Sequence, residues 1–400
     1  MKALTLTLCR FCVVFLVSLL LIFSYFIATE KSVESPKSSA STTSLIHTNQ
    51  CPDVLRHTTQ GTWRTRPLTP EEDSEIMHFL RDSNTRFRFP ANYQRQDGRC
   101  GNVVYPSARK FRALCDPKGH TPCCFYNRCM NKNVSECVCE ECYDIRQDAH
   151  AEYSTWVPSH PACPYRVFSS QEACDLLTGS THHFVGDSLV RHVYTALLLV
   201  IAGDMDYGAI NDSVSEDIKQ SCKGLHMFSE KTCRLHLRYK TKACNGTANL
   251  EMKYYTHAAD GIKIEQESLS LAGRKSIVFF GIGVHDDFNV NLICRNYVSP
   301  LVMQLKKMRA VWPRVIWMDA HAPGLFKSPF YYKQSASSVE KFNFQMEPCL
   351  TKLEVPIFRT FNLTDGMSSF DGEHYGRGIN LIKANIFLSY LKELRSTGKW

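Results

Sequence analysis

The sequence predicts an α/β fold whose C-terminal half is a parallel sheet with connecting helices. From about residue 179 onward, short apolar runs alternate with helical patterns. Strands that alternate with helices indicate a parallel sheet joined by short right-handed crossovers. All but the last of these runs lack clean alternation, as expected for strands buried on both faces. The expected strands are residues 181–185, 276–281, 314–318 and 355–361.

Helical periodicity fills most of the intervals between these strands. The expected helices are residues 188–201, 296–310, roughly 335–353, and 377–394. The interval 203–273 is different, because it carries three cysteines and two β-like runs, 235–240 and 251–256. It is interpreted either as a decorated insertion or as the region of a second strand.

The N-terminus carries an uncharged apolar run at residues 11–28, which is long enough to cross a bilayer. Lys2 and Arg10 precede it, so the positive-inside tendency predicts a type II single-pass protein with residues 1–10 in the cytoplasm. A cleaved signal peptide is the alternative, but no clear cleavage site precedes Thr29. We therefore expect an uncleaved transmembrane signal anchor. Residues 29–50 are rich in Ser and Thr and are expected to form a stem.

Cysteine usage predicts an oxidising compartment. Of 18 cysteines, Cys9 and Cys12 lie at the apolar segment and the other 16 follow it. An even, dense set outside the cytosol indicates disulfides, whose connectivity cannot be read from sequence. A zinc site is the alternative for the segment Cys137-Val138-Cys139-Glu140-Glu141-Cys142, although its spacing is irregular. Residues 51–178 are thus expected to form a cysteine-rich lumenal region.

Four N-x-S/T acceptors fit glycosylation in the secretory pathway: Asn133, Asn211, Asn245 and Asn362. Together with the anchor and the cysteines, they predict a lumenal ectodomain in the Golgi or elsewhere in the secretory pathway, with the cell surface or secretion as alternatives. The formal charge of +8 is spread along the chain without a long Lys/Arg block, which argues against a nucleic-acid partner.

A serine, an acid and a histidine follow expected strands of the α/β half. Gly186-Asp187-Ser188 lies between the first strand and a helix, whose free N–H groups can stabilise negative charge. Asp371-Gly372-Glu373-His374 precedes the last helix. These residue types are the parts of a nucleophilic acyl-transfer site. The plain alternatives are that Ser188 caps the helix and that Asp371 and His374 lie in a solvated turn.

Other polar residues are expected at the same edge, since ligands bind beyond the carboxyl ends of parallel strands. Residues 281–286 follow the second clear strand, and Asp319-Ala320-His321 follows the third. His321 either lines the pocket or only ends the strand. His192 lies one helical turn after Ser188; substrate contact is possible, but helix surface or packing is the preferred interpretation.

These motifs resemble the SGNH/GDSL hydrolase superfamily. The sequences FVGDSLVRH and DGEHYG, with the anchor and the cysteine-rich lead-in, resemble its PC-esterase branch. That branch includes trichome-birefringence-like, sialate O-acetyltransferase and neurexophilin-and-PC-esterase proteins. The resemblance covers residues 179–395 and implies a catalytic domain over 179–400, a three-layer sandwich with a parallel, flavodoxin-like sheet.

The resemblance also implies roles for individual residues. Ser188 would be the nucleophile, His374 the general base and Asp371 the carboxylate that orients the histidine. Gly283 and His285 would form the oxyanion pocket, with His285 standing where the family usually has asparagine. A neutral imidazole N–H can donate in the same way. The second-block glycine is left open among Gly203, Gly208 and Gly224.

The implied function is that of a lumenal acyl-ester enzyme, first of all an O-acetyltransferase that modifies glycans through an acyl-Ser188 intermediate. It would need neither a cofactor nor a metal, while an acetyl donor such as acetyl-CoA would be a substrate. A glycan or glycoconjugate would be the partner, and the N-terminal helix would contact the membrane. A carbohydrate or lipid esterase is the first alternative. An inactive cysteine-rich binding protein on a hydrolase scaffold is the second.

Overall fold

The computed structural model describes residues 51–88, 93–229 and 233–400. The expected anchor at 11–28 and stem at 29–50 lie outside the described residues. Within the described ranges, no helix is both long and apolar enough to span a membrane.

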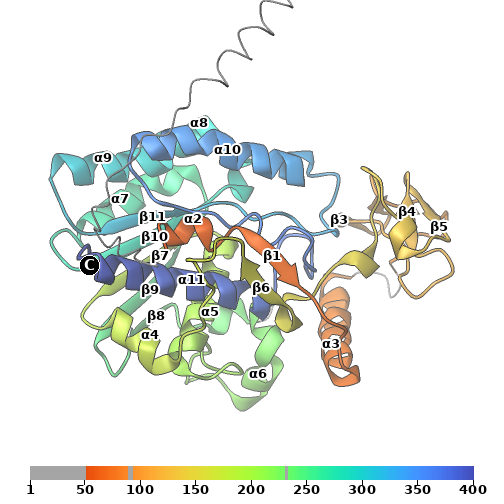
Figure 1. Cartoon of the computed structure of the whole chain (residues 1–400), viewed down its shortest axis with the longest axis horizontal. Helices are drawn as coiled ribbons and strands as arrows, with labels where there is room; N and C mark the ends of the chain where they lie inside the picture. Colours follow the sequence, from red (N-terminus) through yellow and green to blue (C-terminus); the bar gives the residue numbers. More distant parts are fainter. Residues whose placement is uncertain (1–50, 89–92, 230–232) are drawn as a thin grey trace, which may run out of the picture. The chain divides into compact units, whose positions relative to one another are not determined.

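A six-stranded sheet lies at the centre of the α/β half, in the order β12-β11-β10-β7-β9-β8 (Figure 1). Five strands pair in parallel, and only the edge strand β8 is antiparallel to its neighbour. Numbered along the chain, the five parallel strands have the doubly wound order 2-1-3-4-5. Their bounds are β7 Thr181–Gly186, β8 Lys240–Ala243, β9 Ala248–Tyr254, β10 Ser276–Gly281, β11 Arg314–Met318 and β12 Ile357–Phe358.

Alternate residues of the central strands β7, β10 and β11 enter two separate apolar clusters. Phe184 and Phe279 pack on one face, against α5 (Ser188–Ala202) and α11 (Arg377–Ser396). Val278 and Trp317 pack on the other, against α9 (Ser299–Lys307) and α10 (Ala336–Lys352), with α7 (Gly261–Leu269) beside them. The described fold is therefore three-layered, and burial on both faces explains why β10 and β11 are short apolar runs without clean alternation.

Several expected elements end elsewhere. The runs at 276–281 and 314–318 are strands as expected, but only Ile357–Phe358 pairs within the run at 355–361. This edge strand has one neighbour, and Pro356 brings no N–H to the ladder. The expected helix at 296–310 is also divided: α8 (Val290–Ile293) leads into a π-helical turn, Cys294–Val298, before α9. Pro300, in the first turn of α9, cannot donate an N–H to a continuous helix.

The interval 203–273 supplies the strand pair β8 and β9, so the second-strand interpretation is the correct one. The run at 251–256 falls largely on β9. Of the run at 235–240, only the last residue lies in a strand, β8. Cys244 and Asn245 adopt positive φ angles of 54° and 56° in the turn between β8 and β9. This turn, rather than the apolar pattern, sets where the two strands begin and end. The interval also contains α6 (Glu216–Ser221) and the 3-10 turn η4 (Gly224–Phe228).

The cysteine-rich region is built from short paired strands. These are β1 (Gly61–Arg64) with β6 (Thr155–Pro158), β2 (Val104–Tyr105) with β3 (Ala108–Arg112), and β4 (Cys123–Phe125) with β5 (Arg128–Met130). Its helices are α2 (Val54–His57), α3 (Pro70–Phe87) and α4 (Ser170–Leu177).

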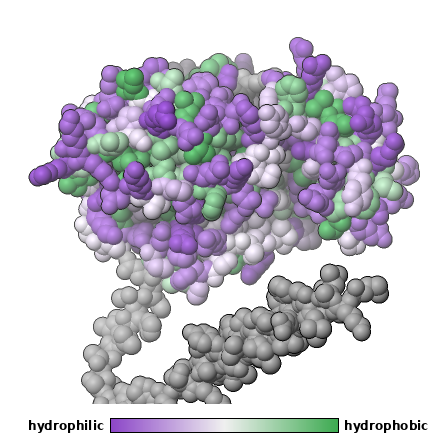
Figure 2. Space-filling view, turned by 90° about the horizontal axis from the view of Figure 1, so that it is seen from above, coloured by the Kyte–Doolittle hydropathy of each residue, from purple (hydrophilic) through white to green (hydrophobic). Residues whose placement is uncertain are grey.

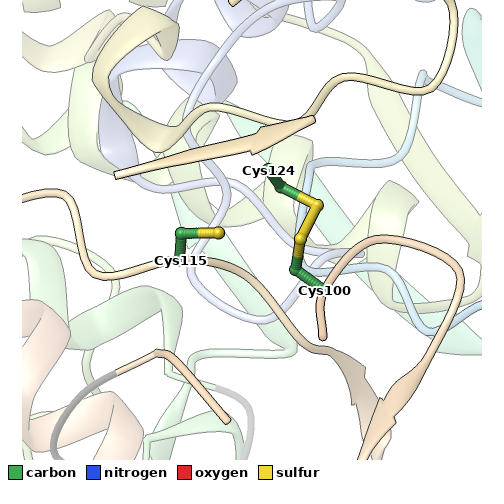
Figure 3. A group of neighbouring side chains, drawn as sticks. All are labelled: Cys100, Cys115 and Cys124. Carbon is green, nitrogen blue, oxygen red and sulfur yellow. A yellow bond between two sulfur atoms is a disulfide. The ribbon is translucent and has the colours of Figure 1, made fainter. Parts of the chain in front are cut away.

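All 16 cysteines of the described part form disulfides, so the zinc alternative for residues 137–142 is wrong. Figure 3 shows the bond between Cys100 and Cys124, with Cys115 beside it. The pairs are Cys51–Cys163, Cys100–Cys124, Cys115–Cys129, Cys123–Cys137, Cys139–Cys142, Cys174–Cys244, Cys222–Cys233 and Cys294–Cys349.

The cysteine-rich region packs on loops at the carboxyl edge of the sheet. Single β-bridges join Phe111 to Lys327 and Ala149 to Met367. A Cβ added to Gly378 would lie 2.4 Å from the carbonyl carbon of Ala151, so backbones meet closely here. On the face seen in Figure 2, hydrophobic and hydrophilic side chains are interspersed. The four asparagines of the glycosylation motifs are all exposed.

Candidate active site

Two glycines bring the end of β7 close to β10 just before Ser188. Gly186 is aligned with Gly281, and a Cβ on Gly186 would lie 2.2 Å from the Gly281 carbonyl oxygen. Its φ of 154° also disfavours other residues. The chain then turns directly into α5, whose first residue is Ser188.

Asp187, not Ser188, is the N-cap of α5. Its carboxylate accepts the N–H of Leu189 at 2.9 Å. The interpretation of Ser188 as the cap is therefore wrong, and its hydroxyl is available for another partner. Burial raises the pKa of Asp187 to about 7, and the bond from Leu189 opposes this only in part.

Ser188, His374 and Asp371 form one hydrogen-bonded chain. His374 Nε2 lies 2.7 Å from Ser188 Oγ, and His374 Nδ1 lies 2.7 Å from Asp371 Oδ2. With the proton on Nδ1 donated to the carboxylate, Nε2 can accept the serine proton. The structure thus brings Ser188 to a pair of residues at the other end of the α/β half, and only 7% of the Ser188 surface is exposed.

Asp371 is held in its ionised form. Burial opposes its charge, but His374 and hydrogen bonds outweigh burial and place its pKa below the usual value. Its Oδ1 accepts the backbone N–H groups of Glu373 at 2.9 Å and of His374 at 2.7 Å. These bonds fix the carboxylate in the orientation that the imidazole requires.

The loop that carries Asp371 and His374 rests on residues 324–327. Gly372 has a φ of 85°, and a Cβ there would lie 2.3 Å from the backbone nitrogen of Lys327. Its carbonyl accepts the N–H of Gly324 at 3.1 Å, and Lys327 pairs with Glu373. The solvated-turn interpretation is therefore wrong, because the loop packs closely against residues 324–327.

A buried histidine contacts the backbone of the same loop, and a buried lysine contacts that histidine. His321 Nε2 lies 2.7 Å from the Glu373 carbonyl, and Lys383 Nζ lies 2.9 Å from His321 Nδ1. Both side chains are buried, and burial lowers the pKa of Lys383 to about 7 although Asp187 opposes the shift. His321 therefore holds the loop backbone. Sequence reasoning missed Lys383; the available signal was a lysine on the apolar face of the last helix, next to Ile382.

His192 is buried against His374, in agreement with the packing interpretation. Their ring centroids lie 5.2 Å apart, and Phe228 packs edge-on against His192 at 5.5 Å. Burial holds the pKa of His192 well below its usual value, so the ring is neutral. His192 thus forms part of the wall behind the His374 imidazole.

Gly283 and His285 lie beyond β10: Gly283 caps the turn η7 (Val284–Asp286), and His285 lies within it. The His285 ring lies 5.5 Å from that of His257, and within the described ranges it makes no hydrogen bond to the protein. Burial and His257 lower its pKa, which favours the neutral imidazole. A Cβ on Gly283 would lie 2.5 Å from the Phe288 ring, so the turn is tightly packed. Asp286 accepts the Ala258 N–H at 2.7 Å and holds the turn in place.

None of the three second-block candidates offers a free backbone donor. Gly203 ends α5, at the far end of the helix from Ser188. The N–H groups of Gly203, Gly208 and Gly224 are bonded to the carbonyls of Val200, Asp204 and Asp206. The backbone N–H of Ser188, at the first position of α5, remains as a candidate donor.

No family model matches the chain, and no curated protein is significantly similar in sequence. Among solved structures, it is similar to Est24, a carbohydrate acetylesterase from Sinorhizobium meliloti, with 13% identity and a TM-score of 0.31 over 54% of this chain and 99% of that one. A lipase/acylhydrolase from Enterococcus faecalis has 10% identity and a TM-score of 0.29, over 55% and 96% of the two chains. The M. smegmatis aryl esterase has 13% identity and a TM-score of 0.31, over 54% and 98%. At these scores the similarity is too low to assign an activity.

Proposed function

We propose that this chain is a serine-dependent acyl-ester enzyme that works through an acyl-Ser188 intermediate. The observation that carries the proposal is the hydrogen-bonded chain from Ser188 through His374 to Asp371. As Ser188 Oγ bonds to the carbonyl carbon of an ester, His374 Nε2 takes the hydroxyl proton. The ester C–O bond then breaks, and the imidazolium returns the proton to the leaving alcohol. Asp371 stays ionised and stabilises the imidazolium.

The negative charge on the carbonyl oxygen needs donors close to Ser188. The Ser188 N–H lies at the start of α5, where unpaired N–H groups and the helix dipole favour an anion. His285 is the proposed second donor, since its ring is neutral and lies beyond the neighbouring strand. A histidine in this position replaces the asparagine of the family that the motifs resemble.

The acyl-enzyme is released either to a sugar hydroxyl or to water. We propose O-acetyl transfer onto glycans, in the lumen of the secretory pathway, as the more specific function. The motifs' likeness to the PC-esterase branch, the flavodoxin-like strand order and the disulfides support it. Ester hydrolysis of a carbohydrate or lipid requires no group beyond those already described, because water then replaces the sugar. An inactive scaffold is disfavoured by the intact hydrogen bonds of the three residues.

A fluorophosphonate probe tests the acyl-enzyme step directly. We expect the purified full-length chain to be labelled at Ser188, because the probe reacts with serines activated by a neighbouring base. Ser188→Ala should abolish labelling, and His374→Ala should slow it strongly. If the folded chain stays unlabelled while a known serine esterase is labelled beside it, the proposal fails.

A second experiment separates transfer from hydrolysis. The chain is incubated with acetylated and unacetylated glycans, with and without acetyl-CoA, beside Ser188→Ala as the matched control. Mass spectrometry then follows the acetyl groups. Donor-dependent gain on unacetylated glycans supports transfer, whereas loss from acetylated glycans without a donor supports hydrolysis.

A further inference from the structure

Two histidines and an aspartate converge where α3 meets η4, outside the candidate active site. His78 and Asp82 are four residues apart on α3, so their side chains lie on one face of the helix. His226 comes from η4, in a distant part of the chain. Asp82 Oδ2 lies 3.6 Å from His78 Nε2 and 3.9 Å from His226 Nε2.

These separations fit ligands of a shared ion better than hydrogen bonds. Both distances exceed the usual N–H···O range. Ligands at 2.0–2.2 Å from a tetrahedral zinc ion lie roughly 3.3–3.6 Å from one another. The three ligand atoms already lie within 4.8 Å of one another. The two Asp82 separations would need to shorten by only a few tenths of an ångström, and the two imidazoles by up to roughly 1.4 Å, which rotation of the exposed His78 side chain can supply.

Packing holds much of this arrangement in place. The His226 ring contacts the edge of Phe79 at 5.3 Å and His78 at 5.9 Å. Below them, Phe79 belongs to an apolar cluster with Leu225 from η4. The side chain of His78 is 67% exposed, which gives an ion access from solvent and leaves room for water ligands.

We propose that His78, Asp82 and His226 bind a divalent transition-metal ion. Two imidazoles and one carboxylate are a donor set that suits Zn²⁺, whereas Ca²⁺ and Mg²⁺ require mostly oxygen ligands. Competing thiolates are absent from the described part, because its 16 cysteines are paired as disulfides. The ion joins α3 of the cysteine-rich region to η4 of the α/β half.

The site lies one aromatic layer from the proposed catalytic histidine. Phe370 contacts Phe79 at 5.5 Å on one side and stacks on His374 at 6.0 Å on the other. Phe228, also on η4, packs against His192. The ion therefore stabilises the wall behind His374 without reaching the reacting atoms, so its role is structural and does not depend on the proposed function.

Zinc binding to the full-length chain in detergent tests the proposal. After EDTA treatment and dialysis, titration with ZnSO₄ should show one ion per chain and a rise in Tm. His226→Asn and Asp82→Asn should weaken binding by about 10- to 100-fold or more, because losing a direct ligand costs at least as much as losing an outer-shell partner. His78→Asn should weaken binding similarly, and at this exposed position it is expected to leave the fold intact. His120→Asn is the control, since His120 is exposed elsewhere.

Cobalt provides the second readout. Co²⁺ bound in place of zinc should give visible d–d absorption bands in the wild type and in His120→Asn but not in His78→Asn. The proposal is overturned if the wild type does not bind Zn²⁺ at micromolar concentrations, or if His78→Asn binds it as tightly as His120→Asn. Equal stabilisation by CaCl₂ would also overturn the assignment of a transition metal.

Discussion

Two aspartates near Ser188, one buried and one largely buried, show how neighbouring donors decide what a carboxyl group does. Asp371 accepts three hydrogen bonds, one of them from the His374 imidazole, and its pKa falls despite burial. Asp187 accepts a single bond from Leu189, and burial raises its pKa to about 7. Asp371 is therefore suited to stabilise an imidazolium, while Asp187 serves as a cap that leaves the Ser188 hydroxyl free.

Asp371→Asn should remove most of the activity while leaving the fold intact. An amide at this position no longer favours the His374 tautomer with its proton on Nδ1, so Nε2 becomes a poor base for Ser188. By analogy with the same change in a serine protease, kcat should fall by about 10⁴. Hydrolysis of p-nitrophenyl acetate measures the loss, and circular dichroism checks folding. Unchanged turnover would remove Asp371 from the mechanism.

His285 gives a separate prediction, because replacing it with asparagine keeps a side-chain N–H donor and replacing it with alanine does not. His285→Ala should lower kcat by about two to three orders of magnitude if the imidazole donates to the oxyanion. His285→Asn should retain much more activity, since its amide can donate in the same way. The two variants are compared by their kcat values; equal, negligible effects would show that His285 lies outside the oxyanion site.

The sequence predicted the elements that local periodicity determines. β10, β11, α5 and α11 lie within two residues of their expected bounds, and the Ser188 and His374 motifs lie at the expected edge. The bounds of elements that depend on neighbours were not predicted: β12 covers only two residues of the expected strand 355–361 at the sheet edge, and a π-turn interrupts the expected helix 296–310 before α9. Lys383 was missed for the same reason. A lysine in a helix is usually solvated, so its place on the apolar face of α11 was a weak signal, and the packing of α11 is what shows that it is buried.

At the scale of α11, burial of Lys383 predicts how stability depends on pH. Its folded pKa is about 7, below the usual value, so between pH 7 and about 10 the unfolded chain carries a proton that the folded chain lacks. The contribution of Lys383 to the free energy of unfolding therefore rises with pH, by about 1 kcal/mol per pH unit. This gain in stability is lost as the pH falls towards 7. Lys383→Met should remove this slope.

Urea unfolding at pH 7, 8 and 9 measures the effect. The difference between wild type and Lys383→Met should change steadily across this range, while Lys392→Met, an exposed lysine on the same helix, should follow the wild type. His321 and Asp187 face the amine and are retained in both variants. Parallel pH profiles for all three proteins would show that the amine keeps its proton on folding.

At the scale of the whole molecule, disulfides determine how distant segments are held together. The sequence predicted that the cysteines pair but not how, because pairing depends on which Cα atoms the fold brings within reach. Cys51–Cys163 spans 112 residues and ties the start of the described chain to the segment before α4. Cys139–Cys142 spans only 3. The two bonds therefore constrain the unfolded chain to very different extents.

Loop length gives the corresponding prediction for stability. In the chain-entropy account, closing the Cys51–Cys163 loop contributes about 5 kcal/mol to the free energy of unfolding, and closing the Cys139–Cys142 loop about 2 kcal/mol. Replacing both cysteines of the long pair with serine should lower Tm clearly more than replacing both of the short pair, which is the matched control. Thermal unfolding followed by circular dichroism, at one scan rate for all variants, checks the order. A larger loss from the short pair would show that local packing around Cys139, not the length of the closed loop, governs what these bonds contribute.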